Sequence, residues 1–160
     1  MTGSRRMWFV VGVLVVLHFF LQVGLGLGAR APDLLVIALL VSARSMGTGS
    51  SAGTGFGLGL LEDAFSSLAF GANALSLAIV GAVGAGTRQL FVGDSMAFLV
   101  SYLFVGKWTR DFLHWVTVGE GLREPFFQTI VLEGMGSAAY ATAAGVGVFA
   151  LAGVRWEPVI

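Results

Sequence analysis

Cysteine is absent from this 160-residue chain, and charged residues make up only 11% of it. Without cysteine the chain has no disulfide framework, no thiolate metal site and no cysteine nucleophile. The two histidines fall in different apolar segments, so they do not form a histidine-rich metal site. The formal net charge is zero, which provides no basic face for nucleic acid. We therefore expect no metal, no other cofactor and no nucleic-acid partner.

The scarcity of charge is matched by an excess of apolar residues. Hydrophobic residues make up 56% of the chain, and its mean hydropathy is +0.88. A soluble domain carries about a quarter charged residues, so this chain has too few to coat a water-facing surface. One spanning helix needs about 20 apolar residues, which leaves room for up to about six helices and no sizeable soluble domain. The composition predicts an all-α integral membrane protein with one polytopic domain, residues 1–160.

Six transmembrane helices are expected, because proline, glycine and charged residues separate the apolar runs. The first run is longer than the apolar region of about 7–15 residues in a signal peptide, so we expect it to remain as an uncleaved helix. Pro32 and Pro125 suit the first positions of the second and sixth helices. The expected helices cover residues 7–27, 33–46, 50–65, 72–87, 95–118 and 125–153.

The distribution of positive charge predicts the orientation of these helices. An even number of spans puts both ends of the chain on one side. With cytoplasmic ends, two basic residues fall outside, Arg30 and Arg123, and five fall inside: Arg5, Arg6, Arg44, Arg88 and Arg155. This excess on the inner side favours cytoplasmic N- and C-termini.

A glycine ladder is the most distinctive stretch of the sequence. Gly53 and Gly57, and likewise Gly55 and Gly59, are spaced four apart, so each pair lies on one face of a helix. Such small-xxx-small pairs let neighbouring helices approach closely. We therefore expect a tightly packed central helix over residues 50–65, with both glycine pairs in its contacts and Asp63 at its end.

The polar residues of the expected spans are distributed asymmetrically. In the predicted orientation they lie in the outer half of the membrane, whereas the cytoplasmic halves are apolar. Burying a charge at the centre of a spanning helix costs at least about 2.5–3.5 kcal/mol, so these groups need partners or water. The asymmetry predicts a polar interior that opens outward, or a charge network that docks a partner, formed by Asp63, Asn73, Lys107, Asp111 and Glu133.

The spacing of these residues allows specific ion pairs. Lys107 and Asp111 are four apart on one helix, and Glu133 lies on the next, so we expect Lys107 to pair with Asp111 or with Glu133. Arg110 and His114 are also four apart near the end of their helix. For these two the expectation is mutual neutralisation of the charges, or snorkelling to the headgroups.

No catalytic constellation accompanies these charges. The sequence has no Gly-x-Ser-x-Gly, no His-Glu-x-x-His and no phosphate loop. Glu62 and Asp63 are adjacent, so they point to different faces of a helix and do not form an acid pair. We therefore expect that the protein is not an enzyme.

Two motifs occur at the ends of the expected helices. Pro-Asp-Leu-Leu opens the second expected helix at residues 32–35. Gly-Phe-Gly-Leu-Gly-Leu-Leu-Glu-Asp at residues 55–63 is followed, after a short corner, by Gly-Ala-Asn-Ala-Leu at residues 71–75. This pattern resembles the rod shape-determining MreD family, in which a glycine-rich helix ending in Leu-Leu-x-Asp precedes a helix that starts Gly-x-x-Ala-Leu. Length and helix count match as well, whereas the part from Val92 onward carries no family motif.

The resemblance implies a non-enzymatic scaffold of the bacterial elongasome, which controls rod shape and peptidoglycan synthesis. Its direct partner would be the bitopic protein MreC, and its indirect partners MreB and the glycosyltransferase/penicillin-binding protein pair. The fold would be similar to the S subunits of energy-coupling-factor transporters. We expect the partner's periplasmic domain to contact an outer rim formed by Arg30, Asp33, Glu120, Arg123 and Glu124.

That similarity leaves a second function open. The chain is alternatively a vitamin-binding S subunit of an energy-coupling-factor transporter, with the outward polar cavity as its pocket. A solute pocket draws aromatic and hydrogen-bonding groups from facing helices. Here Trp108, His114 and Trp115 share one helix and the facing polar set is thin, which favours the scaffold.

Overall fold

The computed structural model describes residues 3–66, 69–87 and 96–151, and these form helices and connections without a strand. Arg88 and Arg155, which the charge count placed on the inner side, lie outside the described residues. The α-helices are α1 Gly3–Phe19, α2 Leu34–Ala43, α3 Thr48–Ala64, α4 Ala72–Gly86, α5 Met96–Thr117 and α6 Gly134–Leu151. The helices α2 to α5 agree with the expected segments to within a few residues, whereas α1 ends at Phe19 and not at residue 27, and α6 begins at Gly134 and not at residue 125.

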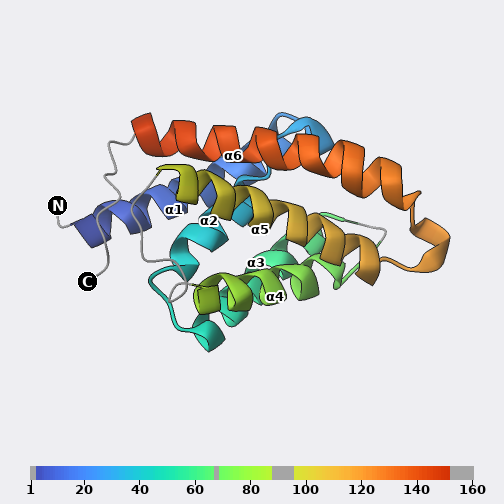
Figure 1. Cartoon of the computed structure of the whole chain (residues 1–160), viewed down its shortest axis with the longest axis horizontal. Helices are drawn as coiled ribbons and strands as arrows, with labels where there is room; N and C mark the ends of the chain where they lie inside the picture. The colour runs from blue at the N-terminus through green and yellow to red at the C-terminus, as the bar shows by residue number, and fades with distance from the viewer. Residues whose placement is uncertain (1–2, 67–68, 88–95, 152–160) are drawn as a thin grey trace.

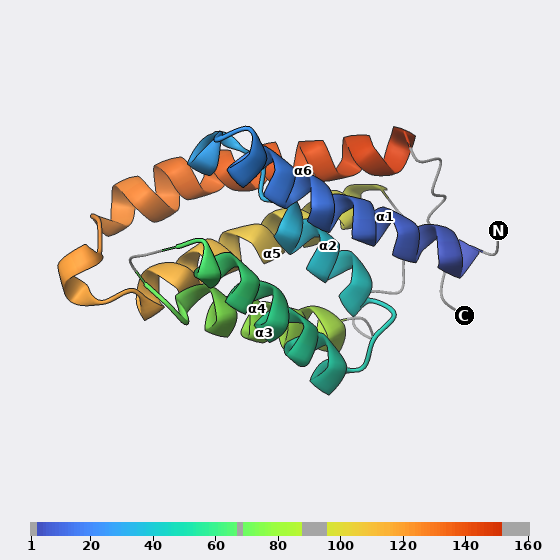
Figure 2. The same cartoon turned by 180° about the vertical axis from the view of Figure 1, so that it is seen from behind.

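The short helix α2 is the centre of the bundle. All ten of its residues are buried, and it contacts every other α-helix. Figure 2 shows it between α1 on one side and the α3–α4 pair on the other. A helix that is apolar on every face is stable only when it is surrounded. The central helix is therefore α2, and the expectation that the glycine-rich helix occupies the centre is wrong.

Helices α3 and α4 form a close hairpin through one face of the glycine ladder. A Cβ atom built on Gly55 would clash with the backbone at Leu77, and one on Gly59 would clash with the backbone at Ala74. The same construction on Gly53 and Gly57 meets nothing within 4 Å. Of the two glycine pairs, Gly55 and Gly59 pack against α4, whereas Gly53 and Gly57 lie on the outer side of α3.

Two helices are extended by π-helical turns. Phe20–Gly24 continues α1, and Phe127–Glu133 precedes α6. With these turns, two helices among the described residues are long and apolar enough to span a membrane, Arg5–Gly24 and Phe127–Leu151. The apolar helices α2 and α4 are shorter, at 10 and 15 residues.

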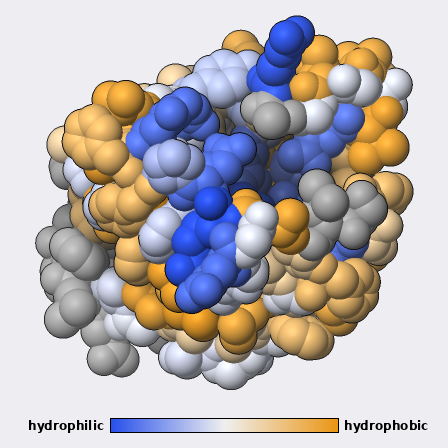
Figure 3. All heavy atoms as spheres, turned by 90° about the vertical axis from the view of Figure 1, so that its right-hand side faces the viewer, coloured by the Kyte–Doolittle hydropathy of each residue, from blue (hydrophilic) through white to orange (hydrophobic). Residues whose placement is uncertain are grey.

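The two ends of the bundle differ. The start of α1 and the end of α6 lie together at one end, on the left of Figure 1. The α3–α4 corner and the α5–α6 connection lie at the opposite end, on the right. The connection contains the 3-10 turn Glu120–Leu122. Figure 3 views this second end directly: hydrophilic residues surround a hollow in the middle, and hydrophobic residues encircle them.

A candidate site in the buried polar cluster

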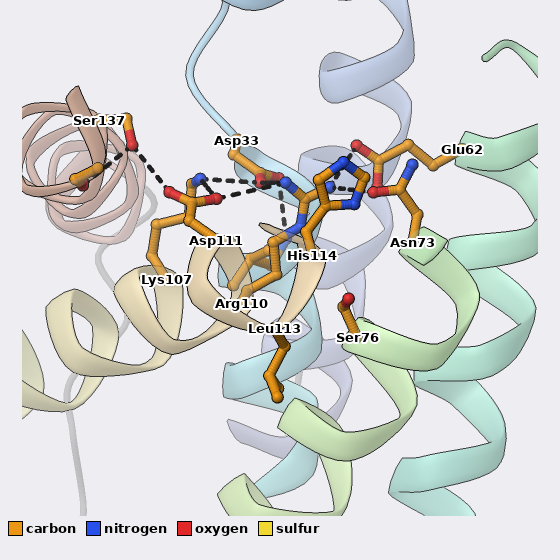
Figure 4. Close-up of polar contacts among 12 residues, drawn as sticks. Asp33, Glu62, Asn73, Ser76, Lys107, Arg110, Asp111, Leu113, His114 and Ser137 are labelled. Atoms are coloured by element: carbon orange, nitrogen blue, oxygen red, sulfur yellow. Dashed lines mark hydrogen bonds and ion pairs between the residues drawn. The ribbon is translucent and has the colours of Figure 1, made fainter. Parts of the chain in front are cut away.

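Arg110 of α5 is the centre of a polar cluster inside the second end of the bundle. Its side chain is largely buried, with the residue 9% exposed. The Nη2 atom donates to Glu62 Oε1 at 2.8 Å and to Asn73 Oδ1 at 2.7 Å, so the guanidinium bridges α3 and α4. Its Nη1 atom lies 3.7 Å from Asp33 Oδ2 and 3.3 Å from Asp111 Oδ1. Arg110 therefore points inward and is neutralised by carboxylates, and it does not snorkel (Figure 4).

Lys107 lies one turn earlier on α5 and extends the cluster toward α6. Its ammonium group pairs with Asp111, as the spacing predicted, and lies 3.4 Å from Asp33 Oδ2. Ser137 of α6 donates to Asp111 Oδ2 at 2.9 Å. Lys107 is only 4% exposed, so the favourable geometry of its two carboxylates must offset a large desolvation cost. Asp33, Lys107, Arg110 and Asp111 thus connect helices that are distant in sequence (Figure 4).

Asp63 has a different role, because it caps a neighbouring helix. Its carboxylate is 1% exposed. It accepts hydrogen bonds from the backbone amides of Gly71 at 2.9 Å, Asn73 at 3.2 Å and Ala74 at 3.0 Å. The first amides of a helix lack intrahelical partners, and the helix dipole favours a negative charge there. Gly71 has φ +95°, a conformation that side chains other than glycine rarely adopt, and this orients the amides toward Asp63.

Asp33 belongs to this interior and not to the exposed rim. It is the N-cap residue of α2, where Oδ1 accepts from the Val36 amide at 3.3 Å. Its Oδ1 atom also lies 3.9 Å from Nδ1 of the fully buried His18 of α1. The expected rim contact for Asp33 is therefore corrected: the residue is 9% exposed, since capping α2 and pairing with the cations of α5 both draw it inward.

Glu133 lies apart from the cluster. It is exposed, and its Oε1 atom accepts from Nε2 of Gln128 at 3.2 Å. It makes no ion pair with Lys107, which is paired with Asp33 and Asp111 instead. Of the two pairings expected for Lys107, the structure has the one with Asp111 and not the one with Glu133. The reason is local: Glu133 ends a π-helical segment, whose wider turns shift the face that a regular α-helix count from Pro125 would assign.

The remaining rim residues lie on the surface. Arg30, Glu120 and Glu124 are exposed. Arg123 is half-buried, because it folds back over α5: its Cζ atom lies 4.6 Å from the centre of the Trp115 ring. Its Nη2 atom donates to the carbonyl of Val116 at 2.8 Å and to that of Val118 at 3.1 Å.

A polar cavity adjoins the cluster at this end of the bundle. Its volume is about 630 Å³, and Lys107, Asp111 and Ser137 contribute to its wall. The far side is formed by the α5–α6 connection and the π-helical turn, including Arg123, Thr129 and Glu133. The hollow surrounded by hydrophilic residues in Figure 3 lies at this end. A polar interior was expected from the sequence, and this cavity adjoins the buried polar cluster at one end of the bundle.

The cluster has a structural role, because its contacts connect separate helices. Its cations and carboxylates pair with one another and with backbone amides, so they hold α2, α3, α4, α5 and α6 together. Among the described residues, Arg110 Nε and Glu62 Oε2 are the buried charged-group atoms of this cluster that have no hydrogen-bond partner. In the ranges that the structure describes, no group of three or more His, Cys, Asp or Glu side chains is placed to hold a metal ion.

Sequence reasoning missed the most connected members of the cluster. Arg110 was assigned to the helix end, Glu62 was set aside as the neighbour of Asp63, and Asp33 was placed on the rim. A usable signal existed for Asp33, since an aspartate directly before an apolar run is a typical N-cap residue. For Glu62 the sequence holds no such signal, because its partner lies 48 positions away.

Comparisons with protein-family models, with curated proteins and with solved structures found no match to this chain.

Proposed function

We propose that this chain is a multi-pass scaffold of a bacterial inner membrane, similar to the MreD family, that holds a bitopic MreC-like partner. The partner crosses the membrane once and carries a periplasmic domain. Through it the scaffold acts indirectly on MreB and on the glycosyltransferase/penicillin-binding protein pair of the elongasome. The scaffold itself performs no turnover. The observation that carries the proposal is the buried cluster around Arg110, whose charged groups are occupied with one another.

The exposed apolar surface supports a bilayer location. Large hydrophobic side chains project from several sides of the bundle, among them Phe9, Val16, Phe65, Phe70 and Phe127, each at least 65% exposed. Soluble monomers rarely expose contiguous apolar patches larger than a few hundred Å². In lipid these side chains need no further cover. The short helix α2 is about 15 Å long at 1.5 Å per residue, so it would cross only part of the bilayer while remaining enclosed by the other helices.

The separation of the two ends supports the orientation. The polar cluster and cavity lie at the end opposite to the start of α1 and the end of α6. With cytoplasmic termini, that polar end faces the periplasm. The exposed rim residues Arg30, Glu120 and Glu124 then meet the compartment in which the partner's soluble domain is located.

A scaffold needs a rigid frame more than a changeable pocket. Arg110 and Asp63 together tie the α3–α4 hairpin to α5, since one bridges Glu62 to Asn73 and the other caps α4. Breaking a buried pair leaves an uncompensated charge, so such a network resists local opening. The rim that surrounds this frame is therefore held in a fixed arrangement, as a docking surface requires.

Site-specific photocrosslinking tests the proposal. A photoreactive amino acid is placed at Glu120 or Glu124 on the rim, and at Ser45 on the opposite side as the matched control; all three are exposed. The scaffold proposal predicts that both rim positions crosslink a single-span membrane protein in living cells, whereas Ser45 does not reach its periplasmic domain. Absence of any such product from both rim positions would contradict it.

One observation favours the alternative of a vitamin-binding S subunit. The cavity of about 630 Å³ is in the size range of small-molecule pockets. The two functions are distinguished by measuring the thermal stability of the purified chain with added vitamins. A ligand whose free concentration is a thousand times its dissociation constant stabilises the folded state by about 4.1 kcal/mol. A large thermal shift with one vitamin, together with recovery of ATP-binding subunits, would replace the scaffold by the transporter.

A further inference from the structure

The polar cavity contains charged groups that the buried cluster does not use. Lys107 and Asp111 on its inner wall are paired with each other. Arg123, Glu124 and Glu133 on its outer wall take part in no ion pair within the described part of the chain. The cavity thus presents unpaired charges of both signs at its mouth.

Arg123 is held in place without a counter-charge. Two backbone carbonyls and the Trp115 ring fix its guanidinium, yet its buried Nε atom has no hydrogen-bond partner among the described residues. Fixed guanidinium groups bind carboxylates and phosphates through charge-assisted hydrogen bonds. Since the side chain is already ordered, little conformational entropy is lost when an anion binds to it.

Glu133 supplies the opposite charge. Its carboxylate accepts one hydrogen bond, from the neutral amide of Gln128, and has no cation at ion-pair distance in the described ranges. Glu124 is also exposed. Its backbone carbonyl oxygen accepts a hydrogen bond from Trp115 Nε1 at 2.8 Å. A carboxylate with spare acceptor capacity beside a cavity is suited to an ammonium group, which donates three hydrogen bonds.

We propose that this cavity binds a zwitterion, with its acid group on Arg123 and its ammonium group on Glu133. A simple anion would meet the carboxylates of Glu124 and Glu133, and a simple cation would meet the guanidinium of Arg123. A molecule that carries both charges satisfies both the guanidinium and the carboxylates of the wall. Phosphoethanolamine has this chemistry, either as a phospholipid headgroup or as a free solute. The inference goes beyond the scaffold function and does not depend on it.

Native mass spectrometry of the full-length chain tests this directly. The protein is released from nanodiscs of equal parts phosphatidylethanolamine and phosphatidylglycerol, and the retained lipids are counted. Both lipids carry the phosphate, but only the first carries the ammonium group. Because a charge-assisted hydrogen bond contributes roughly a factor of ten or more, we expect about tenfold preferential retention of phosphatidylethanolamine. Equal retention of the two lipids, without stabilisation by the free zwitterion, would overturn the proposal.

A second arm separates the lipid from the solute. Free phosphoethanolamine is added to the delipidated protein in detergent, and the thermal transition is measured beside inorganic phosphate and ethanolamine alone. Stabilisation by phosphoethanolamine, and not by either half, supports a zwitterion site and identifies a soluble source if the lipid arm shows no preference. Stabilisation by phosphate alone to the same extent would reduce the site to an anion site and contradict the proposal.

Two matched pairs of variants locate the site. Arg123→Gln and Glu133→Gln remove one charge each from the cavity, whereas Arg30→Gln and Glu120→Gln remove the same charges from exposed positions that do not line it. The preference should fall toward unity in the first pair and remain in the second. A preference unchanged in all four variants would place the ligand elsewhere. The comparison of lipids on the unaltered chain stands even if a variant fails to fold.

Discussion

Arg110 and Glu62 form an ion pair across the bundle, with 2.8 Å between Nη2 and Oε1. The pair joins α5 to the end of α3, and both side chains are largely withdrawn from solvent. It makes the glycine-rich hairpin and the charged helix α5 one rigid unit. The scaffold account depends on this unit, because the surrounding rim is positioned by it.

Loss of one partner of this pair should be costly. Arg110→Ala leaves Glu62 without its counter-charge and Asp33 with Lys107 alone on α5, and removing one partner of a buried pair typically costs about 3–5 kcal/mol. The free energy of unfolding, measured by denaturant titration in mixed micelles, should fall by about that amount. Arg30→Ala, at an exposed position, should change it by less than about 0.5 kcal/mol. Similar losses of unfolding free energy in the two variants would show that the cluster does not hold the helices together.

A double-mutant cycle isolates the contact between the two residues. Glu62→Gln and Arg110→Gln are measured separately and together. Residues in direct contact show coupling energies of about 0.5–3 kcal/mol, whereas additive losses would indicate that each residue acts through other partners.

Asp63 should be essential for the start of α4. Asp63→Ala removes the acceptor for three backbone amides, and loss of an N-cap side chain costs about 0.5–2 kcal/mol. Asp63→Asn keeps one oxygen and should recover part of this loss. Hydrogen exchange of the amides of Gly71, Asn73 and Ala74 should accelerate in the alanine variant. Unchanged protection at these three amides would argue against the cap.

The two faces of the glycine ladder should respond oppositely to alanine. Gly55→Ala and Gly59→Ala place a methyl group against the α4 backbone, and such overpacking costs roughly 1–3 kcal/mol. Gly53→Ala and Gly57→Ala meet open space, and alanine favours a helix over glycine by roughly 0.5–1 kcal/mol. Thermal stability of the four purified variants checks this. Equal destabilisation by all four would contradict the placement of α3.

Tyr102 should contribute to the packing of the other half of the bundle. Its hydroxyl group lies 2.9 Å from the carbonyl oxygen of Leu40 and 3.3 Å from that of Gly84, so it links α5 to α2 and α4. Tyr102→Phe removes the hydroxyl alone, and we expect a loss of about 0.5–1.5 kcal/mol in unfolding free energy. Ser101→Ala, on the exposed side of α5, is the control that should have no such effect.

Helix positions could be predicted from the sequence because local signals determine them. Apolar runs, prolines and glycines placed the six expected segments within a few residues of the observed bounds once the π-helical turns are counted with α1 and α6. The local pair of Lys107 and Asp111 was predictable for the same reason, since four residues make one helical turn. The central position of α2 was missed, although its ten residues without a polar face except Ser42 are typical of an enclosed helix.

The candidate site was only partly predictable, because its contacts depend on tertiary packing. Which way Arg110 points is decided by the position of Glu62 on a distant helix, and no local pattern encodes that. Glu133 was misplaced because a π-helical segment changes the register of α6, and neither its presence nor its position follows from residue spacing. Gly53 and Gly57 share their motif with Gly55 and Gly59, so sequence alone does not distinguish the packed face from the open one.

The central claim is that the chain holds a single-span partner, and co-purification tests it most directly. The chain is tagged in its own host membrane, extracted in mild detergent and analysed for proteins recovered in stable amounts. The account predicts an MreC-like bitopic protein with a periplasmic domain, retained by the Gly53→Ala control and reduced when the rim charges Glu120 and Glu124 are reversed. Recovery of ATP-binding subunits with a coupling membrane protein, and no bitopic partner, would contradict the scaffold and assign the cavity to solute uptake.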